Sequence, residues 1–266
     1  MCYYNHVKMT REGKMLLKRL EKLVANYKFI GDRMYTGLEY PQAPVLQRIP
    51  DQTDFEIVEK EWGLLPTNIT SVERVSDFRI KAMTLNARSE NLFVNEQGRP
   101  AMFADAAMNR RCLIPSTGFY EWRHVKQRGK NGKVLKQTIA FPYIIKTSES
   151  NPFYFAGIWN PGKVNGDTFS IVTTEANDLM QQIHNTAKRM PTILTEDLAW
   201  EWMFNSALSK TDVQDIARSQ YDAAKLTCYT VDKGFRTAPD PTVPVHYSEL
   251  PPLGDDIMGT PQLALF

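Results

Sequence analysis

The feature that most restricts the fold is a series of short β-rich segments in the second half of the chain. These stretches of β-branched and aromatic residues are bounded by Asn, Pro and Gly, as expected for short strands separated by turns. They span 111–115, 118–125, 141–146, 153–159 and 168–174. Helical patterns are interspersed with them, but strands and helices do not alternate in the regular order of a parallel sheet. We therefore expect an α+β fold with curved, mainly antiparallel sheets.

The other segments extend this prediction. Residues 10–27 are expected to form an amphipathic helix, because Thr10 is a favourable N-cap and Leu16, Leu20 and Leu23 recur at helical spacing. The segments 111–115 and 118–125 are expected to pair with each other, and the proline-containing stretch 41–54 to be irregular. Further helices are predicted at 100–110, 175–183, 195–203 and 210–219, strands at 55–62, 80–85, 190–194 and 226–231, and a hairpin tip at 126–137. Prolines dominate from residue 236, so we predict one domain over 1–235 and an extended tail over 236–266.

Composition narrows the classes of function. The 266 residues carry a formal net charge of +2, so any surface for nucleic acid must come from local clusters of Lys and Arg. Three widely spaced cysteines without a CxxC motif argue against a disulfide framework and a zinc site, and neither a metal nor another cofactor is expected. No apolar run reaches the length of a membrane span. We therefore expect a cytoplasmic monomer that does not enter a membrane.

The chain starts with Met1-Cys2, which offers unusual chemistry. Because the side chain of Cys2 is small, we expect Met1 to be removed, which leaves an amine and a thiol on neighbouring carbons. An α-amino group titrates near pH 8, so part of it is a neutral nucleophile that can condense with an aldehyde to a Schiff base. The thiol could then close a five-membered thiazolidine ring. From these two residues alone, an accidental Met-Cys start is the simpler interpretation.

A few polar residues within apolar sequence are candidates for catalysis. Glu121 follows Phe119 and Tyr120 and precedes Trp122, and burial among aromatic rings would raise its pKa and make it a general acid or base near neutral pH. By strand alternation it shares a face with Phe119, although it could also point to solvent from an edge strand. His184 at a helix end suggests either a capping residue or a proton-transfer group.

Asn86 and Arg88 lie at the end of a predicted strand. They fit either a simple turn or an amide and a guanidinium directed at an anion.

Seven segments, in order from residue 1 to about 194, resemble the SOS-response-associated peptidase (SRAP) family, whose members shield abasic sites in single-stranded DNA. They are Met1-Cys2, Trp-Gly-Leu-Leu-Pro at 62–66, Asn-Ala-Arg-Ser-Glu at 86–90, 111–115 with Gly-Phe-Tyr-Glu-Trp at 118–122, Phe-Ala-Gly-Ile-Trp at 155–159, Thr-Thr-Glu-Ala-Asn at 173–177, and Ile-His at 183–184 with Arg-Met-Pro at 189–191. The resemblance implies a single α+β domain with a barrel-like core of curved sheets flanked by helices.

The resemblance also implies roles for individual residues. Cys2, freed of Met1, would form a thiazolidine crosslink with the ring-opened sugar of an abasic site. Asn86 would hold the N-terminal residue and the sugar, Glu121 would move protons, and His184 would act in proton transfer and in strand scission or crosslink reversal. Arg88 would bind phosphate.

Further DNA contacts are expected from residues that flank the motifs: Trp62, Phe119, Arg111 and Arg189. For the aromatic residues, packing in the core is the alternative explanation.

Three departures from the family pattern stand out. Tyr3 and Tyr4 replace a Gly-Arg pair after the cysteine. A second tryptophan usual after the motif at 62–66 is absent, and four residues separate His184 from Arg189 where the family has about one.

The chain ends in Gln262-Leu263-Ala264-Leu265-Phe266, which resembles the short peptide by which bacterial proteins bind the replication sliding clamp. The expected partners are thus single-stranded DNA with abasic sites, which would bring the protein to the nucleoid, and a sliding clamp.

Two other functions remain open. One is a cysteine peptidase or N-terminal-nucleophile amidohydrolase that uses Cys2, Glu121 and His184. The other is a non-catalytic binding module. Aldehyde dependence separates the first from the DNA-crosslinking function, because an amidase needs an amide substrate and an oxyanion hole.

Overall fold

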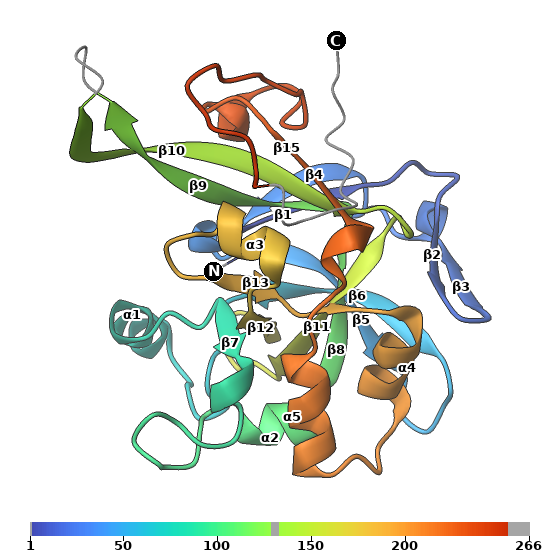
Figure 1. The fold of residues 1–266 in the computed structure, drawn as a ribbon. Coiled ribbons are helices and arrows are strands. Elements are labelled where there is room, and N and C mark those ends of the chain that lie inside the picture. Colours follow the sequence, from blue (N-terminus) through green and yellow to red (C-terminus); the bar gives the residue numbers. More distant parts are fainter. Residues whose placement is uncertain (1, 129–132, 255–266) are drawn as a thin grey trace.

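In the computed structural model, residues 2–128 and 133–254 are described, and they form two main sheets and a small hairpin (Figure 1). The first sheet is antiparallel with the order β15-β10-β9-β1-β4. Its strands are β1 (Tyr4–Lys8), β4 (Asp32–Thr36), β9 (Gly118–Arg128), β10 (Val134–Thr147) and β15 (Leu226–Thr230).

The second sheet closes on itself. Strand β12 pairs with both β6 and β11, and the pairs β6–β5, β5–β8 and β8–β11 complete a ring. Among the strands of the described residues, the pairings of β12 with β6 and β7 are parallel and the others are antiparallel. The strands are β5 (Gln42–Arg48), β6 (Phe55–Trp62), β7 (Asn86–Arg88), β8 (Arg111–Ser116), β11 (Phe153–Asn160), β12 (Thr168–Glu175), β13 (Arg189–Pro191) and β14 (Ile193–Leu194). The predicted α+β fold with curved, mainly antiparallel sheets is confirmed, and this ring takes the place of the expected barrel-like core.

Short helices flank the sheets: α1 (Val72–Lys81), α2 (Ala104–Asn109), α3 (Asp178–Ile183), α4 (Glu196–Phe204) and α5 (Lys210–Arg218). Helix α4 packs on β8 and β11, α5 packs on β12, and α3 lies against β9 (Figure 1). Between the sheets, the ring of Phe119 meets that of Phe155 edge-on, with the centroids 5.6 Å apart. No helix among the described residues has the length and apolar character needed to cross a membrane.

The predicted helix over 10–27 is wrong, because this segment forms the hairpin β2 (Lys14–Leu17) and β3 (Leu20–Leu23). Met15 and Leu17 are buried whereas Leu16 is exposed, which is the period of a strand. Lys18 has a φ of 51° in the turn between the two strands, a conformation that a right-handed helix excludes. Leucines and lysines satisfy both periods in this segment, and pairing across the turn decides between them.

Three further predictions need correction. The stretch 41–54 contains β5, which tolerates Pro44 because β8 pairs with β5 only at Leu46 and Gln47, leaving one edge open at the proline. The expected strand over 80–85 is displaced by α1, and the nearest strand starts at Asn86. The segments 111–115 and 118–125 form strands but do not pair with each other, since β8 joins the ring and β9 joins the first sheet.

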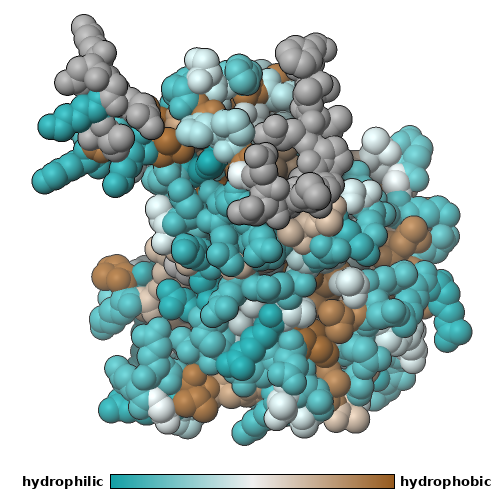
Figure 2. Space-filling view, viewed as in Figure 1, coloured by the Kyte–Doolittle hydropathy of each residue, from teal (hydrophilic) through white to brown (hydrophobic). Residues whose placement is uncertain are grey.

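The segment after residue 235 is not an extended tail as far as it is described. Val231 forms a β-bridge with Pro244, and the hydroxyl of Tyr247 donates to the carbonyl of Val231 at 2.9 Å. Arg123 donates from its two terminal nitrogens to the carbonyls of Pro251 and Pro252, at 2.7 and 3.2 Å. The segment up to Gly254 thus packs on the first sheet, while the clamp-like peptide 262–266 lies outside the described residues. Figure 2 shows that the visible surface is mainly hydrophilic, with small apolar patches.

Candidate active site

The structure brings together the four residues predicted to be catalytic, although they come from distant parts of the chain. Cys2 precedes β1, Asn86 opens β7, Glu121 lies in β9 and His184 is the C-cap of α3. The side-chain amide of Asn86 donates to the backbone carbonyl of Cys2 at 3.0 Å. His184 Nδ1 lies 3.7 Å from Glu121 Oε1. The pairing of Asn5 with Phe119 carries the start of the chain to the strand that bears Glu121.

Burial controls the protonation of this site. Glu121 is 3% exposed, and loss of hydration raises its pKa to about 7, so it exists in both forms at neutral pH. Burial also raises the pKa of the Cys2 thiol, and the negative charge of Glu121 adds to that shift. The thiol is therefore protonated in this structure. The predicted burial of Glu121 on the face of Phe119 is confirmed, with Tyr120 and Trp122 on the opposite side of β9 in a second cluster around Phe235.

His184 is neutral at physiological pH, because burial lowers its pKa to about 4. Its Nδ1 is 2.8 Å from the carbonyl oxygen of Arg189. A carbonyl can only accept, so we assign the proton to Nδ1, which makes Nε2 the basic nitrogen of the ring. Of the two, Glu121 can both give and take a proton near neutral pH, while the neutral ring of His184 offers Nε2 as an acceptor.

Tyr3 is a member of the site that sequence reasoning missed. Its side chain is partly buried, and its pKa is raised by burial and by the charges of Glu121 and Cys2, and lowered by the charge of Arg88. The phenol thus lies within electrostatic reach of both the buried carboxyl group and Arg88. Arg88 itself has a side chain that is 45% exposed and a 3.4 Å contact with Glu96, so its guanidinium is accessible to a ligand. The signal for Tyr3 in the sequence is that it directly follows Cys2, the expected nucleophile.

Four other residues predicted to contact DNA lie in the interior. Trp62 is 1% exposed, donates from Nε1 to the carbonyl of Leu85 at 2.8 Å and stacks on Phe169, and Phe119 is fully buried. Neither ring has a face for a nucleobase in this structure. The core-packing explanation therefore holds for both aromatic residues.

The two arginines predicted beside them are structural as well. The buried guanidinium of Arg111 donates to backbone carbonyls, among them that of Trp202 at 2.6 Å and that of Asn205 at 2.6 Å, which attaches α4 to β8. Arg189 makes a two-pronged ion pair with Glu90, at 2.6 and 3.0 Å. These interactions occupy the donors that a phosphate would need.

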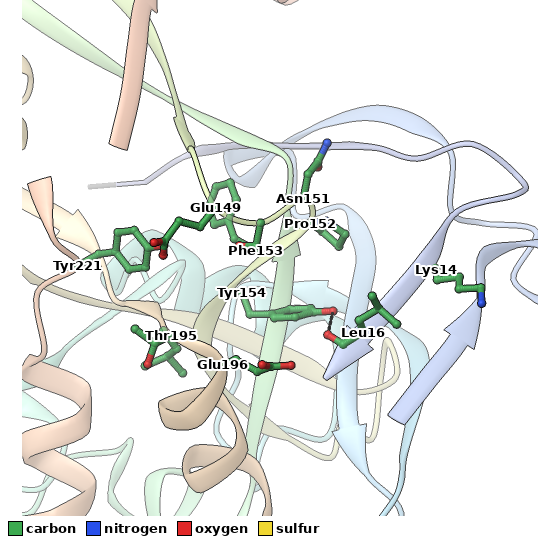
Figure 3. A pocket seen from close by; sticks show the side chains of 12 residues that line it. Lys14, Leu16, Glu149, Asn151, Pro152, Phe153, Tyr154, Thr195, Glu196 and Tyr221 are labelled. Atoms are coloured by element: carbon green, nitrogen blue, oxygen red, sulfur yellow. Dashed lines mark hydrogen bonds between the residues drawn. The ribbon is translucent and has the colours of Figure 1, made fainter. Parts of the chain in front are cut away.

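Two more observations delimit the site. Among the described residues, no group of three or more His, Cys, Asp or Glu side chains is arranged to hold a metal ion. A cavity of about 450 Å³ lies elsewhere, between the β2–β3 hairpin, the loop before β11 and the start of α4 (Figure 3). Its lining includes Leu16, Glu149, Tyr154 and Glu196, but none of the four residues predicted to be catalytic.

Comparison with known proteins agrees with this geometry. The family described as SOS response associated peptidase (SRAP) matches residues 1–237. Two Bacillus subtilis proteins, named abasic site processing proteins YoqW and YoaM, are 32% and 30% identical to the chain over 195 residues; each alignment covers 72% of this chain and 76% or 75% of the relative. The abasic site processing protein HMCES of Xenopus tropicalis is 24% identical over 172 residues, which cover 58% of this chain and 46% of that protein.

The fold is also found in a solved structure. A protein from Bacteroides thetaiotaomicron superposes with a TM-score of 0.68 at 27% identity, covering 91% of this chain and 97% of that one. A protein from Bordetella bronchiseptica shares the fold with a TM-score of 0.59 at 20% identity, covering 87% of this chain and all of that one. With a family match that extends over most of its length, the chain belongs to the SOS response associated peptidase (SRAP) family.

Proposed function

We propose that the protein recognises abasic sites in single-stranded DNA and forms a covalent thiazolidine with them through Cys2 after loss of Met1. The amine of Cys2 adds to the aldehyde of the ring-opened sugar and loses water to give an imine. The thiol sulfur then bonds to the imine carbon, and the proton of the thiol passes by way of Glu121 to the nitrogen. The crosslink would cover the lesion and protect the strand in the DNA damage response.

The observation that carries this proposal is the buried carboxyl group of Glu121, with a pKa of about 7, next to His184 and within electrostatic reach of Cys2. Imine formation needs a group that donates a proton to the departing water, and ring closure needs a group that accepts the proton of the thiol. Either transfer is most efficient when the pKa of that group lies near the working pH. Asn86 supports the same chemistry because it holds the backbone of the nucleophilic residue at 3.0 Å.

Intact-mass spectrometry tests the proposal directly. The purified protein is measured alone and after incubation with a single-stranded oligonucleotide that contains one abasic site. We expect loss of Met1, and an adduct with the mass of protein plus oligonucleotide less one water. Cys2→Ala should form no stable adduct, whereas Cys112→Ala, which alters another buried cysteine, should form it normally.

Two results would reject the proposal. One is a protein that retains Met1 and forms no adduct with the abasic strand. The other is an adduct that persists when the sugar aldehyde has first been reduced with borohydride, because a reaction without an aldehyde cannot give an imine.

A second candidate function is an amidohydrolase or peptidase that uses Cys2, His184 and Glu121, as the family description suggests. The same groups could remove Met1 by acting on the peptide bond that precedes Cys2. This activity would need no DNA and no aldehyde, so hydrolysis of a peptide by the mature protein, unaffected by abasic DNA, would favour it.

Strand cleavage at the abasic site, an AP-lyase reaction, would appear as a shortened oligonucleotide on a denaturing gel.

A further inference from the structure

The loop that follows His184 folds into a closed turn. Helix α3 has only six residues, and His184 ends it. The N–H of Lys188 donates to the carbonyl of His184 at 2.8 Å, and Lys188 adopts a φ of 49°. The turn returns the chain so that the carbonyl of Arg189 meets His184 Nδ1 at 2.8 Å. The turn therefore keeps the imidazole in contact with the segment that follows it.

Asn185, the first residue of this loop, attaches it to strand β9. Its Oδ1 accepts the backbone N–H of His124 at 3.0 Å, and its Nδ2 donates to the carbonyl of His124 at 2.8 Å. One side-chain amide thus satisfies both polar groups of a strand residue, as a neighbouring strand would. The backbone groups of His124 are available to Asn185 because β1 pairs with β9 only as far as Phe119. This edge of β9 therefore has no strand partner at His124.

These contacts connect the two proton-transfer residues through a short, rigid path. His124 lies three residues after Glu121 on β9, and Asn185 directly follows His184. The two hydrogen bonds of Asn185 therefore fix the end of α3 to the strand that carries the carboxyl group. Besides Glu121, the groups whose charge acts on the imidazole are the amine at the start of the chain, His124 and Arg189. Close to this attachment, His184 Nδ1 and Glu121 Oε1 are 3.7 Å apart.

We propose that Asn185 is a positioning residue, which holds the imidazole of His184 against Glu121 by pairing with the backbone of His124. The inference rests on the proposed function for the reaction that it supports, but the geometry can be tested without that reaction. A displacement of about 1 Å between reacting groups can cost roughly 100-fold in rate. The effect should therefore appear in the rate of crosslinking more than in the final yield.

The test compares Asn185→Ala, which loses both hydrogen bonds, and Asn185→Asp, which keeps the acceptor but loses the donor to the carbonyl. Thr186→Ala is the matched control, since its side chain is exposed in the same loop. We expect crosslinking to slow by roughly 10- to 100-fold in Asn185→Ala, less in Asn185→Asp, and not in Thr186→Ala. The NMR titration of the His184 ring should show its pKa rising from about 4 towards the ordinary value in Asn185→Ala, because the ring gains contact with water.

The outcomes separate the two proposals. A wild-type protein that never crosslinks contradicts the proposed function, while the titration of His184 still judges the role of Asn185. A crosslinking wild type with an Asn185→Ala variant of unchanged rate and unchanged His184 titration overturns the inference. Thermal melting identifies a variant that fails to fold, and in that case Asn185→Asp decides by the same two measurements.

Discussion

Replacing Glu121 with glutamine should make the protein more stable at alkaline pH while it abolishes the proposed chemistry. Glutamine has almost the same shape as a protonated glutamic acid, so the packing in β9 is retained. What changes is the charge, because the carboxyl group is buried and its pKa is raised by loss of hydration from 4.5 to about 7. The folded protein must ionise this group at a cost that glutamine avoids.

The sign and size of the effect follow from linkage. Between pH 4.5 and about 7 the folded chain holds a proton on Glu121 that the unfolded chain has lost, so stability from this group is full below pH 4.5 and falls as the pH rises through 7. At 1.36 kcal/mol per pKa unit the loss is about 3 kcal/mol. His184, with its pKa lowered to about 4, acts in the opposite direction between about pH 4 and 6.5. The wild-type curve alone would therefore hide both contributions.

The difference in unfolding free energy between wild type and Glu121→Gln isolates the contribution of Glu121. Urea unfolding followed by tryptophan fluorescence is measured for wild type and Glu121→Gln between pH 4 and 8.5. We expect the gain in unfolding free energy of the variant to grow by about 3 kcal/mol from pH 4.5 to 8, added to any constant offset. Glu59→Gln, at an exposed position of β6, should show no such growth. A difference curve for Glu121→Gln that is flat with pH would refute the assigned burial and with it the proton-transfer role.

Three further predictions concern other parts of the chain. Gly63 has a φ of 136°, and a Cβ there would lie 2.5 Å from the ring of Tyr40, so Gly63→Ala should lower the unfolding free energy by at least about 2 kcal/mol in urea titrations; an unchanged midpoint would contradict this. Arg189→Met should lower the unfolding free energy by about 1 kcal/mol, because it removes the ion pair with Glu90, whose side chain is 37% exposed and regains part of its hydration, and a melt at the wild-type temperature would speak against the structural role. Truncation after Pro261 should abolish binding to a sliding clamp but leave crosslinking intact; a truncated protein that still binds the clamp would disprove the peptide's role.

The burial of Glu121 could be predicted from the sequence because it is a local property. A carboxyl group that alternates with aromatic residues in one strand has only two faces to choose from, and Phe119 marks the apolar one. The start of helix α4 is local in the same way, because Thr195 caps it and the helix begins directly after this residue.

What could not be predicted depends on partners far away in the chain. Leucine spacing predicts a helix over 10–27, where the hairpin at 14–23 forms, because spacing alone does not show which residues pair. Arg111 and Arg189 looked like phosphate ligands because no local feature indicates that Trp202, 91 residues on, or Glu90, 99 residues back, will take their donors. The pairing of Asn185 with His124, across 61 residues, was likewise invisible.

The same burial determines the order of events in the proposed reaction. It raises the pKa of the Cys2 thiol, so the thiol is protonated and a poor first nucleophile, whereas a free α-amino group has a pKa near 8 and is partly neutral. The amine should therefore attack first, and the thiol should close the ring only when Glu121 accepts its proton. Cys2→Ser tests this order, because its amine can still form the imine but its hydroxyl closes the ring poorly. We expect this variant to give an adduct with abasic DNA only when borohydride is present to reduce the imine. If Cys2→Ser gives no adduct even with borohydride, the thiol must act before the amine. The assignment of Glu121 as the group that activates the thiol in the second step would then be wrong.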